Sequence, residues 1–166
     1  MAPVDATLSR DILAAVDAGF EEQIAFTQDL IRLPSLRGQE ATAQDFFFQA
    51  LKARGYQMDR WVVDVDDIKH HPGFSPVCVD YSNAINVVGT LRPKSETGRS
   101  LILNGHMDVV PVGPLDMWTA PPFEPRREGD WLYGRGSGDM KAGLAINVYA
   151  VDALKRLGYR PAATLY

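Results

Sequence analysis

Two short segments of this sequence carry residues that could perform metal-assisted or acid–base chemistry. The first is Gly105-His106-Met107-Asp108, which directly follows the apolar residues 101–103 and Asn104. In extended chain, side chains two residues apart point to the same side, so His106 and Asp108 can project together. Such a pair can be a metal ligand with its orienting carboxylate, or a general base with its orienting acid. An isolated His-x-Asp tripeptide is more often a polar surface loop, so support must come from elsewhere.

The second segment is a glycine-rich turn, Gly134-Arg135-Gly136-Ser137-Gly138-Asp139. Three glycines in five residues allow tight turns and close backbone approach. They leave Asp139 near the start of a predicted helix, where a carboxylate is electrostatically favoured. Asp139 is therefore either a helix cap or a second chemical group. The glycine spacing matches neither nucleotide-binding pattern, and an acid stands where a phosphate site needs none, so the turn argues against phosphate binding.

The remaining pattern predicts an α/β domain around these two segments. Apolar residues recur at helical spacing, whereas runs rich in Val and Ile indicate strands. Ile12, Val16, Phe20 and Ile24 should form the buried stripe of the first helix. The predicted helices cover residues 12–31, 39–54 and 140–157, and the predicted strands cover residues 56–65, 84–91, 100–104, 131–133 and 162–166. We expect one layered domain with a mixed, mostly parallel sheet flanked by helices, incomplete in this chain. The C-terminal end of strand 100–104, where ligands of such sheets bind, would carry His106.

Composition excludes several classes of protein. The chain has 166 residues, 46% of them hydrophobic and 23% charged, which is typical of a globular protein. Its net charge of −4, with both signs dispersed, does not predict a nucleic-acid partner. The single cysteine, Cys78, rules out an internal disulfide, and the sequence shows no secretory signal or membrane span. A cytoplasmic location is the expectation.

The two segments and the residues between them resemble the M20 metallopeptidase family. The matching features are Gly105-His106-Met107-Asp108-Val109-Val110-Pro111, then Trp118, Pro122-Phe123-Glu124-Pro125, Tyr133-Gly134-Arg135-Gly136 and Asp139-Met140-Lys141-Ala142-Gly143. The resemblance extends to Leu33-Pro34-Ser35 and Asn86-Val87-Val88-Gly89. This family includes acetylornithine deacetylase, succinyl-diaminopimelate desuccinylase, aminoacylase and glutamate carboxypeptidase.

The resemblance implies a role for each site residue. His106 would ligate one zinc ion, Asp139 would bridge two zinc ions, and Asp108 would hold the His106 ring. Cobalt would be a substitute metal, and the peptide bond from Asp139 to Met140 would often be cis. The implied reaction is hydrolysis of an amide bond in N-acyl amino acids or small peptides by a metal-bound hydroxide, in a homodimeric full-length protein.

The Glu-Glu pair of that family, one residue a base and the other a zinc ligand, would lie beyond the strand that begins at Ala162. We therefore expect residues 1–166 to be the N-terminal portion of a catalytic domain whose remainder and dimerisation domain are missing. The apolar strand at the end of the chain also suggests a truncation. Alone, the chain should bind zinc weakly and hydrolyse nothing. The alternative is a non-catalytic or split-chain module that completes its site with another polypeptide. The nucleotide sequence after the Tyr166 codon would discriminate between them.

Three other groups of residues invite a functional interpretation. His70-His71 follows several aspartates, but its surroundings favour a polar loop over a metal cluster. Cys78 has no partner in the sequence and is expected to be an incidental thiol. Trp118 and Phe123 could line a substrate pocket, although aromatic residues in a proline-rich loop more often anchor that loop.

Overall fold

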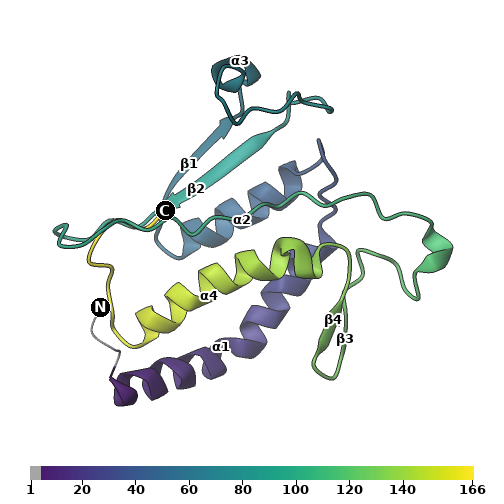
Figure 1. The fold of residues 1–166 in the computed structure, drawn as a ribbon. Coiled ribbons are helices and arrows are strands. Elements are labelled where there is room, and N and C mark those ends of the chain that lie inside the picture. Colours follow the sequence, from purple (N-terminus) through teal and green to yellow (C-terminus); the bar gives the residue numbers. More distant parts are fainter. Residues whose placement is uncertain (1–4) are drawn as a thin grey trace.

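The computed structural model describes residues 5–166 and shows three long helices packed beneath a β-hairpin (Figure 1). The helices are α1 (Ala6–Arg32), α2 (Ala41–Ala53), the single turn α3 (Val65–Ile68) and α4 (Ala142–Arg156). The strands are β1 (Gln57–Val62), β2 (Ile85–Thr90), β3 (Arg126–Glu128) and β4 (Trp131–Tyr133), with a 3₁₀ turn at Leu115–Met117 and a kinked turn at Ser137–Lys141. Within residues 5–166, no helix is long and apolar enough to span a membrane.

The core lies where α1, α2 and α4 meet. Leu30 of α1, Ala43 of α2 and Ala145 of α4 are completely buried there. The ring of Phe26 lies 5.3 Å from Phe46 and 5.8 Å from Tyr149, which joins all three helices through aromatic contacts. Because Met107 belongs to the same buried cluster, the segment that carries His106 and Asp108 rests directly on this core.

The first half of α1 does not bury the stripe that its spacing predicts. Phe20 is 43% exposed and Val16 is also exposed, while Ala15 and Gly19, one position earlier in each case, face α4. The side chain of Arg156 at the end of α4 covers this face: a Cβ atom at Gly19 would lie 2.2 Å from Nη1 of Arg156. Small residues therefore mark the contact face here, and the prediction from large apolar residues was wrong.

The α/β class is confirmed, but the strands that pair fully are antiparallel. β2 pairs with β1 from Ile85↔Val62 to Thr90↔Gln57, and β3 pairs with β4. Parallel pairing was expected to dominate. Within residues 5–166 it occurs only in the isolated bridges Leu36↔Val109 and Leu101↔Leu165. Predicted strand 100–104 is extended, and among the described residues its backbone pairs only with residues 164–166. The sequence also failed to predict β3 and α3.

Candidate metal centre

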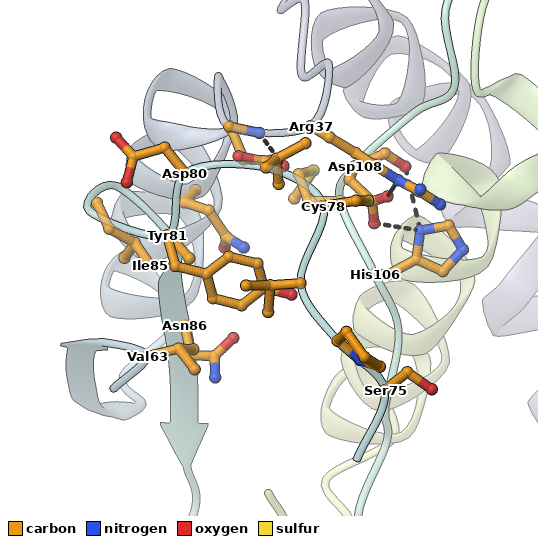
Figure 2. Close-up of a pocket in the computed structure, with 18 of the residues that line it drawn as sticks. Arg37, Val63, Ser75, Cys78, Asp80, Tyr81, Ile85, Asn86, His106 and Asp108 are labelled. Atoms are coloured by element: carbon orange, nitrogen blue, oxygen red, sulfur yellow. Dashed lines mark hydrogen bonds and ion pairs between the residues drawn. The ribbon is translucent and has the colours of Figure 1, made fainter. Parts of the chain in front are cut away.

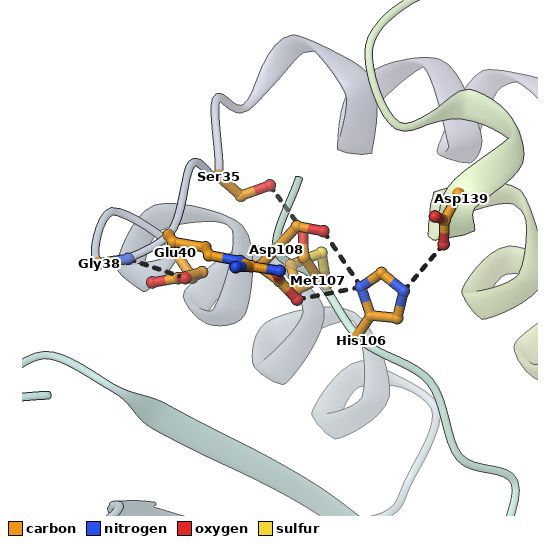
Figure 3. A network of polar contacts seen from close by, with 8 residues as sticks. Ser35, Gly38, Glu40, His106, Met107, Asp108 and Asp139 are labelled. Carbon is orange, nitrogen blue, oxygen red and sulfur yellow. Dashed lines mark hydrogen bonds and ion pairs between the residues drawn. The ribbon is translucent and has the colours of Figure 1, made fainter. Parts of the chain in front are cut away.

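The structure places the imidazole of His106 between two carboxylates (Figure 3). His106 Nδ1 lies 3.0 Å from Oδ1 of Asp108, and His106 Nε2 lies 2.9 Å from Oδ1 of Asp139. The three residues, which the sequence placed in two separate segments, therefore converge across 33 positions of chain. They line a cavity of about 460 Å³ whose other walls come from Arg37, Val109, Val110 and the glycine-rich turn.

The two carboxylates also control the charge of the imidazole. Burial lowers the pKa of His106, but the hydrogen bond with Asp139 and the interactions with Asp108 outweigh burial, so the pKa ends above its ordinary value. Asp139 is 88% exposed, which leaves its second oxygen open to the cavity. Arg37 and Arg135 line the same cavity and balance the two carboxylates, so the site suits a cation through its donor atoms, His106 Nε2 and the oxygens of Asp139, rather than through net charge.

The conformation of the glycine-rich turn positions Asp139. Gly136 has φ +77°, and a Cβ atom there would lie 2.4 Å from Cγ1 of Val109, so only glycine fits. The peptide bond from Asp139 to Met140 is cis, as the family resemblance implied. Lys141 then anchors the turn, because its buried ammonium donates hydrogen bonds of 2.8 Å to the carbonyls of Leu30 and Leu33 at the end of α1. Burial lowers the pKa of Lys141 to about 8.

Residues after α1 hold the segment that carries His106. The Ser35 hydroxyl donates to the carbonyl of Met107 at 2.7 Å, and the Val109 amide donates to the carbonyl of Ser35 at 2.8 Å. Arg37 Nε lies 3.4 Å from Oδ2 of Asp108, and Arg37 lines the same cavity as His106. Sequence spacing could not reveal Arg37 as a neighbour of the site, because 71 positions separate it from Asp108.

The donor set fits a zinc ion in part. Zinc binds imidazole nitrogen and carboxylate oxygen at about 2.0–2.2 Å, so two such donors on one tetrahedral ion lie about 3.4 Å apart. His106 Nε2 and Asp139 Oδ1 already approach to 2.9 Å, and a small side-chain adjustment would accommodate the ion. Within residues 5–166, however, no group of three or more His, Cys, Asp or Glu side chains is placed so that it could hold a metal ion. This chain therefore contributes two metal donors at most.

The other candidate residues lie outside this centre. His71 accepts a hydrogen bond from the amide of Gly73 in an exposed loop, and His70 is exposed beside it. Cys78 is exposed and lines a different cavity, between β2 and residues 105–108 (Figure 2). The indole N–H of Trp118 donates to the carbonyl of Val112 at 2.8 Å, which anchors the proline-rich loop as expected.

The chain is similar in sequence to known proteins. Over 130 residues the chain is 34% identical to a succinyl-diaminopimelate desuccinylase of Ralstonia nicotianae, covering 78% of this chain and 30% of that protein. Over 148 residues it is 35% identical to an N-formyl-4-amino-5-aminomethyl-2-methylpyrimidine deformylase of Halalkalibacterium halodurans, covering 87% of this chain and 31% of that protein. A sequence profile of peptidase family M20/M25/M40 matches residues 102–166. The chain belongs to this family.

Solved structures related to this M20 chain share its fold. A dipeptidase of Saccharomyces cerevisiae superposes with a TM-score of 0.74 at 20% identity, covering 94% of this chain and 33% of that protein. Human carnosine dipeptidase 1 superposes with a TM-score of 0.70 at 18% identity, with the same coverage. The M20 chain thus spans about a third of the length of the relatives that it matches.

Proposed function

We propose that the full-length protein hydrolyses an amide bond of N-acyl amino acids or small peptides with the help of zinc, and that residues 1–166 form the N-terminal portion of its catalytic domain. The observation that supports this most is the placement of His106, with Asp108 at Nδ1 and Asp139 at Nε2. Members of the M20 family are generally metal-dependent, and the relatives named above include a desuccinylase, a deformylase and dipeptidases.

Each residue has a role that follows from its position. The backbone carbonyl of Asp108 accepts the Nδ1–H of His106 at 3.1 Å, and the carboxylate of Asp108 lies 3.0 Å from the same nitrogen; this fixes the tautomer that leaves Nε2 free to bind a metal. Asp139 offers one oxygen beside Nε2 and keeps the other exposed, as a carboxylate that bridges two ions requires. Two zinc ions, or cobalt in their place, would polarise the scissile carbonyl and lower the pKa of a shared water towards about 7. Asp108 is thus a positioning residue in this proposal.

The same geometry limits what the chain does alone. Zinc sites in proteins ordinarily have three or more protein ligands, and residues 5–166 bring together two. The 166-residue chain should therefore bind zinc weakly and show no turnover. The remaining ligands and the general base come from residues beyond this chain, in a full-length protein that we expect to be a homodimer.

A second candidate function follows from the same shortage of ligands. A non-catalytic module, or one that completes its site with another polypeptide, would also show only two converging donors. Reading of the gene beyond the Tyr166 codon separates the two, because continuation into a Glu-Glu pair supports the enzyme and a natural stop codon supports the module.

The decisive assay uses the full-length protein loaded with zinc. N-acetyl, N-succinyl and N-formyl amino acids and dipeptides are offered as substrates, and we expect hydrolysis of at least one class. His106→Ala should abolish the activity, whereas His70→Ala, a matched change in an exposed loop, should leave it unchanged. Hydrolysis of none of these substrates while two zinc ions are bound would contradict the proposal.

A further inference from the structure

Arg37 brings hydrogen-bond donors to the cavity of about 460 Å³ that also holds His106 and Asp139. A guanidinium carries five N–H donors in one plane. Nε of Arg37 lies 3.4 Å from Oδ2 of Asp108, which is longer than the roughly 2.7–2.9 Å of a charged hydrogen bond. Within residues 5–166, Nη1 and Nη2 of Arg37 have no hydrogen-bond partner, and the side chain is 55% exposed. Its remaining donors are therefore available to a ligand.

The backbone around Arg37 is fixed by contacts on both sides. The amide of Val109 donates to the carbonyl of Ser35 at 2.8 Å, just before Arg37 in the chain. The amide of Gly38 donates to Oε1 of Glu40 at 2.9 Å, just after it. A ligand that binds the guanidinium therefore has to order one side chain and no loop, which keeps the entropic cost of binding small.

The same cavity joins Arg37 to the metal donors. His106 Nε2 lies 2.9 Å from Oδ1 of Asp139, and His106 Nδ1 lies 3.0 Å from Oδ1 of Asp108. Arg37 approaches the other oxygen of Asp108. Figure 2 shows the side chains of Arg37, Asp108 and His106 with the contacts that link them. One imidazole ring and one carboxylate therefore separate the guanidinium from a metal ion beside Nε2.

The second arginine of the cavity, Arg135, is engaged elsewhere. Its guanidinium lies 5.0 Å from the centre of the Trp118 ring, where cation–π attraction holds it. Its Nε is buried without a hydrogen-bond partner, so this donor is closed to a ligand. Among the described residues, no lysine lines the cavity. Arg37 is thus the permanent cation of this cavity that can receive an anion.

We propose that Arg37 binds a carboxylate of the substrate that lies several bonds from the scissile amide, and that it makes the protein select such substrates. The inference rests on the proposed function, because it takes the scissile carbonyl to be held by a metal beside Nε2 of His106. The flat fork of a guanidinium matches a carboxylate through two parallel hydrogen bonds, which Nη1 and Nη2 can supply.

The distance between the metal donors and Arg37 selects which carboxylate binds. The α-carboxylate of an N-acyl amino acid sits on the carbon that bears the scissile nitrogen, so it is too close to the metal to reach past His106 and Asp108. A carboxylate at the far end of the acyl group, or of the amino-acid side chain, can reach Arg37. Both sources present the same anion, and a series of ligands separates them.

Arg37 also offsets the repulsion that such an anion meets. Asp108 and Asp139 line the same cavity, and their carboxylates repel an incoming carboxylate. With a neutral residue in place of Arg37, the repulsion remains and the attraction is lost. The preference for an anionic ligand should then vanish or be reversed.

Equilibrium binding to the metal-free full-length protein tests the proposal without any need for turnover. The ligands form pairs that differ in one carboxylate. N-acetylglutamate and N-acetylglutamine differ in the amino-acid side chain, whereas N-succinylalanine and N-succinamylalanine differ at the end of the acyl group. In at least one pair the anionic member should bind about ten- to hundredfold more tightly, as expected for charged hydrogen bonds. Equal affinities within both pairs, or no binding of either anionic ligand, would overturn the proposal.

Variants of two arginines assign the preference to its residue. Arg37→Gln should remove it and change the affinity for the neutral ligand by less than about threefold. Arg32→Gln is the matched control and should keep it, because Arg32 is 53% exposed, pairs with Asp29 at 2.7 Å and lines neither cavity beside the metal centre. Arg37→Lys keeps the charge without the fork and should give an intermediate value. A preference that survives Arg37→Gln would refute the role of Arg37.

Kinetics of the zinc-loaded protein separate this inference from the proposed function. Arg37→Gln should raise KM for the anionic members of the pair that responds, with kcat changed much less. Hydrolysis of anionic and neutral members with equal kcat/KM would refute the role of Arg37 and leave the proposed function intact. A binding preference that depends on Arg37, without hydrolysis of any ligand, would contradict the proposed function alone.

Discussion

Lys141 is the charged residue whose environment makes the clearest prediction about stability. Its side chain is completely buried, and its ammonium donates to the carbonyls of Leu30 and Leu33, which end α1. Burial lowers its pKa from 10.5 to about 8, so the folded protein releases this proton more readily than the unfolded chain does. Folding is therefore linked to pH through Lys141.

The sign and size of the linkage follow from that shift. Below pH 8 Lys141 is charged in both states, and burial of the charge costs about 3 kcal/mol, since each pKa unit corresponds to about 1.4 kcal/mol. Between pH 8 and 10.5 the unfolded chain binds more protons than the folded one, so stability rises with pH. From pH 7 to 9.5 the contribution of Lys141 to the free energy of unfolding should increase by about 2 kcal/mol.

Urea unfolding of the metal-free chain, followed by tryptophan fluorescence at pH 7.0 and 9.5, measures this change. Lys141→Met keeps an unbranched side chain and cannot titrate. The change in its free energy of unfolding between pH 7.0 and 9.5 should therefore be smaller than the change in the unmodified chain by about 2 kcal/mol. Lys52→Met, on the exposed side of α2, is the matched control and should retain the full difference. If Lys141→Met shows the same pH dependence as the unmodified chain, Lys141 is not buried as a cation and the reasoning fails.

Three further predictions concern the metal centre and the core. Asp108→Asn should weaken zinc binding about 10–100-fold in a competition titration, because it removes the negative charge 3.0 Å from Nδ1 while the backbone carbonyl still holds the ring; an unchanged affinity would show that the carboxylate of Asp108 has no role. Gly129→Ala should lower the free energy of urea unfolding by roughly 1–2 kcal/mol, and Gly136→Ala should lower it several times as much. Both glycines have positive φ, but only Gly136 contacts Val109. Phe26→Ala should lower the free energy of unfolding by about 3–5 kcal/mol, against less than about 1 kcal/mol for the exposed Phe20→Ala; similar losses would refute the assigned core face.

The sequence predicted the elements of the fold better than their contacts. α2 and α4 appear within two residues of their expected bounds, whereas α1 starts at Ala6 instead of residue 12; apolar periodicity over 13 or more residues is a strong signal for a helix. Strand pairing was predicted less well. The β1–β2 hairpin is connected by 22 residues that include α3, and no turn motif marks it as a hairpin. The face of α1 was misjudged because Gly19 and Ala15 pack closely against α4, a fact that hydrophobicity alone does not encode.

The sequence also predicted some contacts of the candidate site and not others. His106 and Asp108 could be paired from the sequence because strand geometry fixes the relation of residues two positions apart. The approach of Asp139 depends on the fold as a whole, and only the family resemblance suggested it. Ser35 and Arg37 support the site through contacts over 72 and 71 positions, and no local pattern predicts such contacts.

The arrangement around His106 also separates two roles that the sequence left open. A general base needs one ring nitrogen directed at the proton that it removes, while its orienting acid occupies the other. Here Nε2, the nitrogen that a substrate would have to reach, faces the carboxylate of Asp139 at 2.9 Å, and Asp108 occupies Nδ1. Arg37 pairs with Asp108, so the carboxylate that remains for a metal cation is that of Asp139, directly beside Nε2. The geometry therefore favours His106 as a ligand over His106 as a base, and any base for hydrolysis must come from another residue.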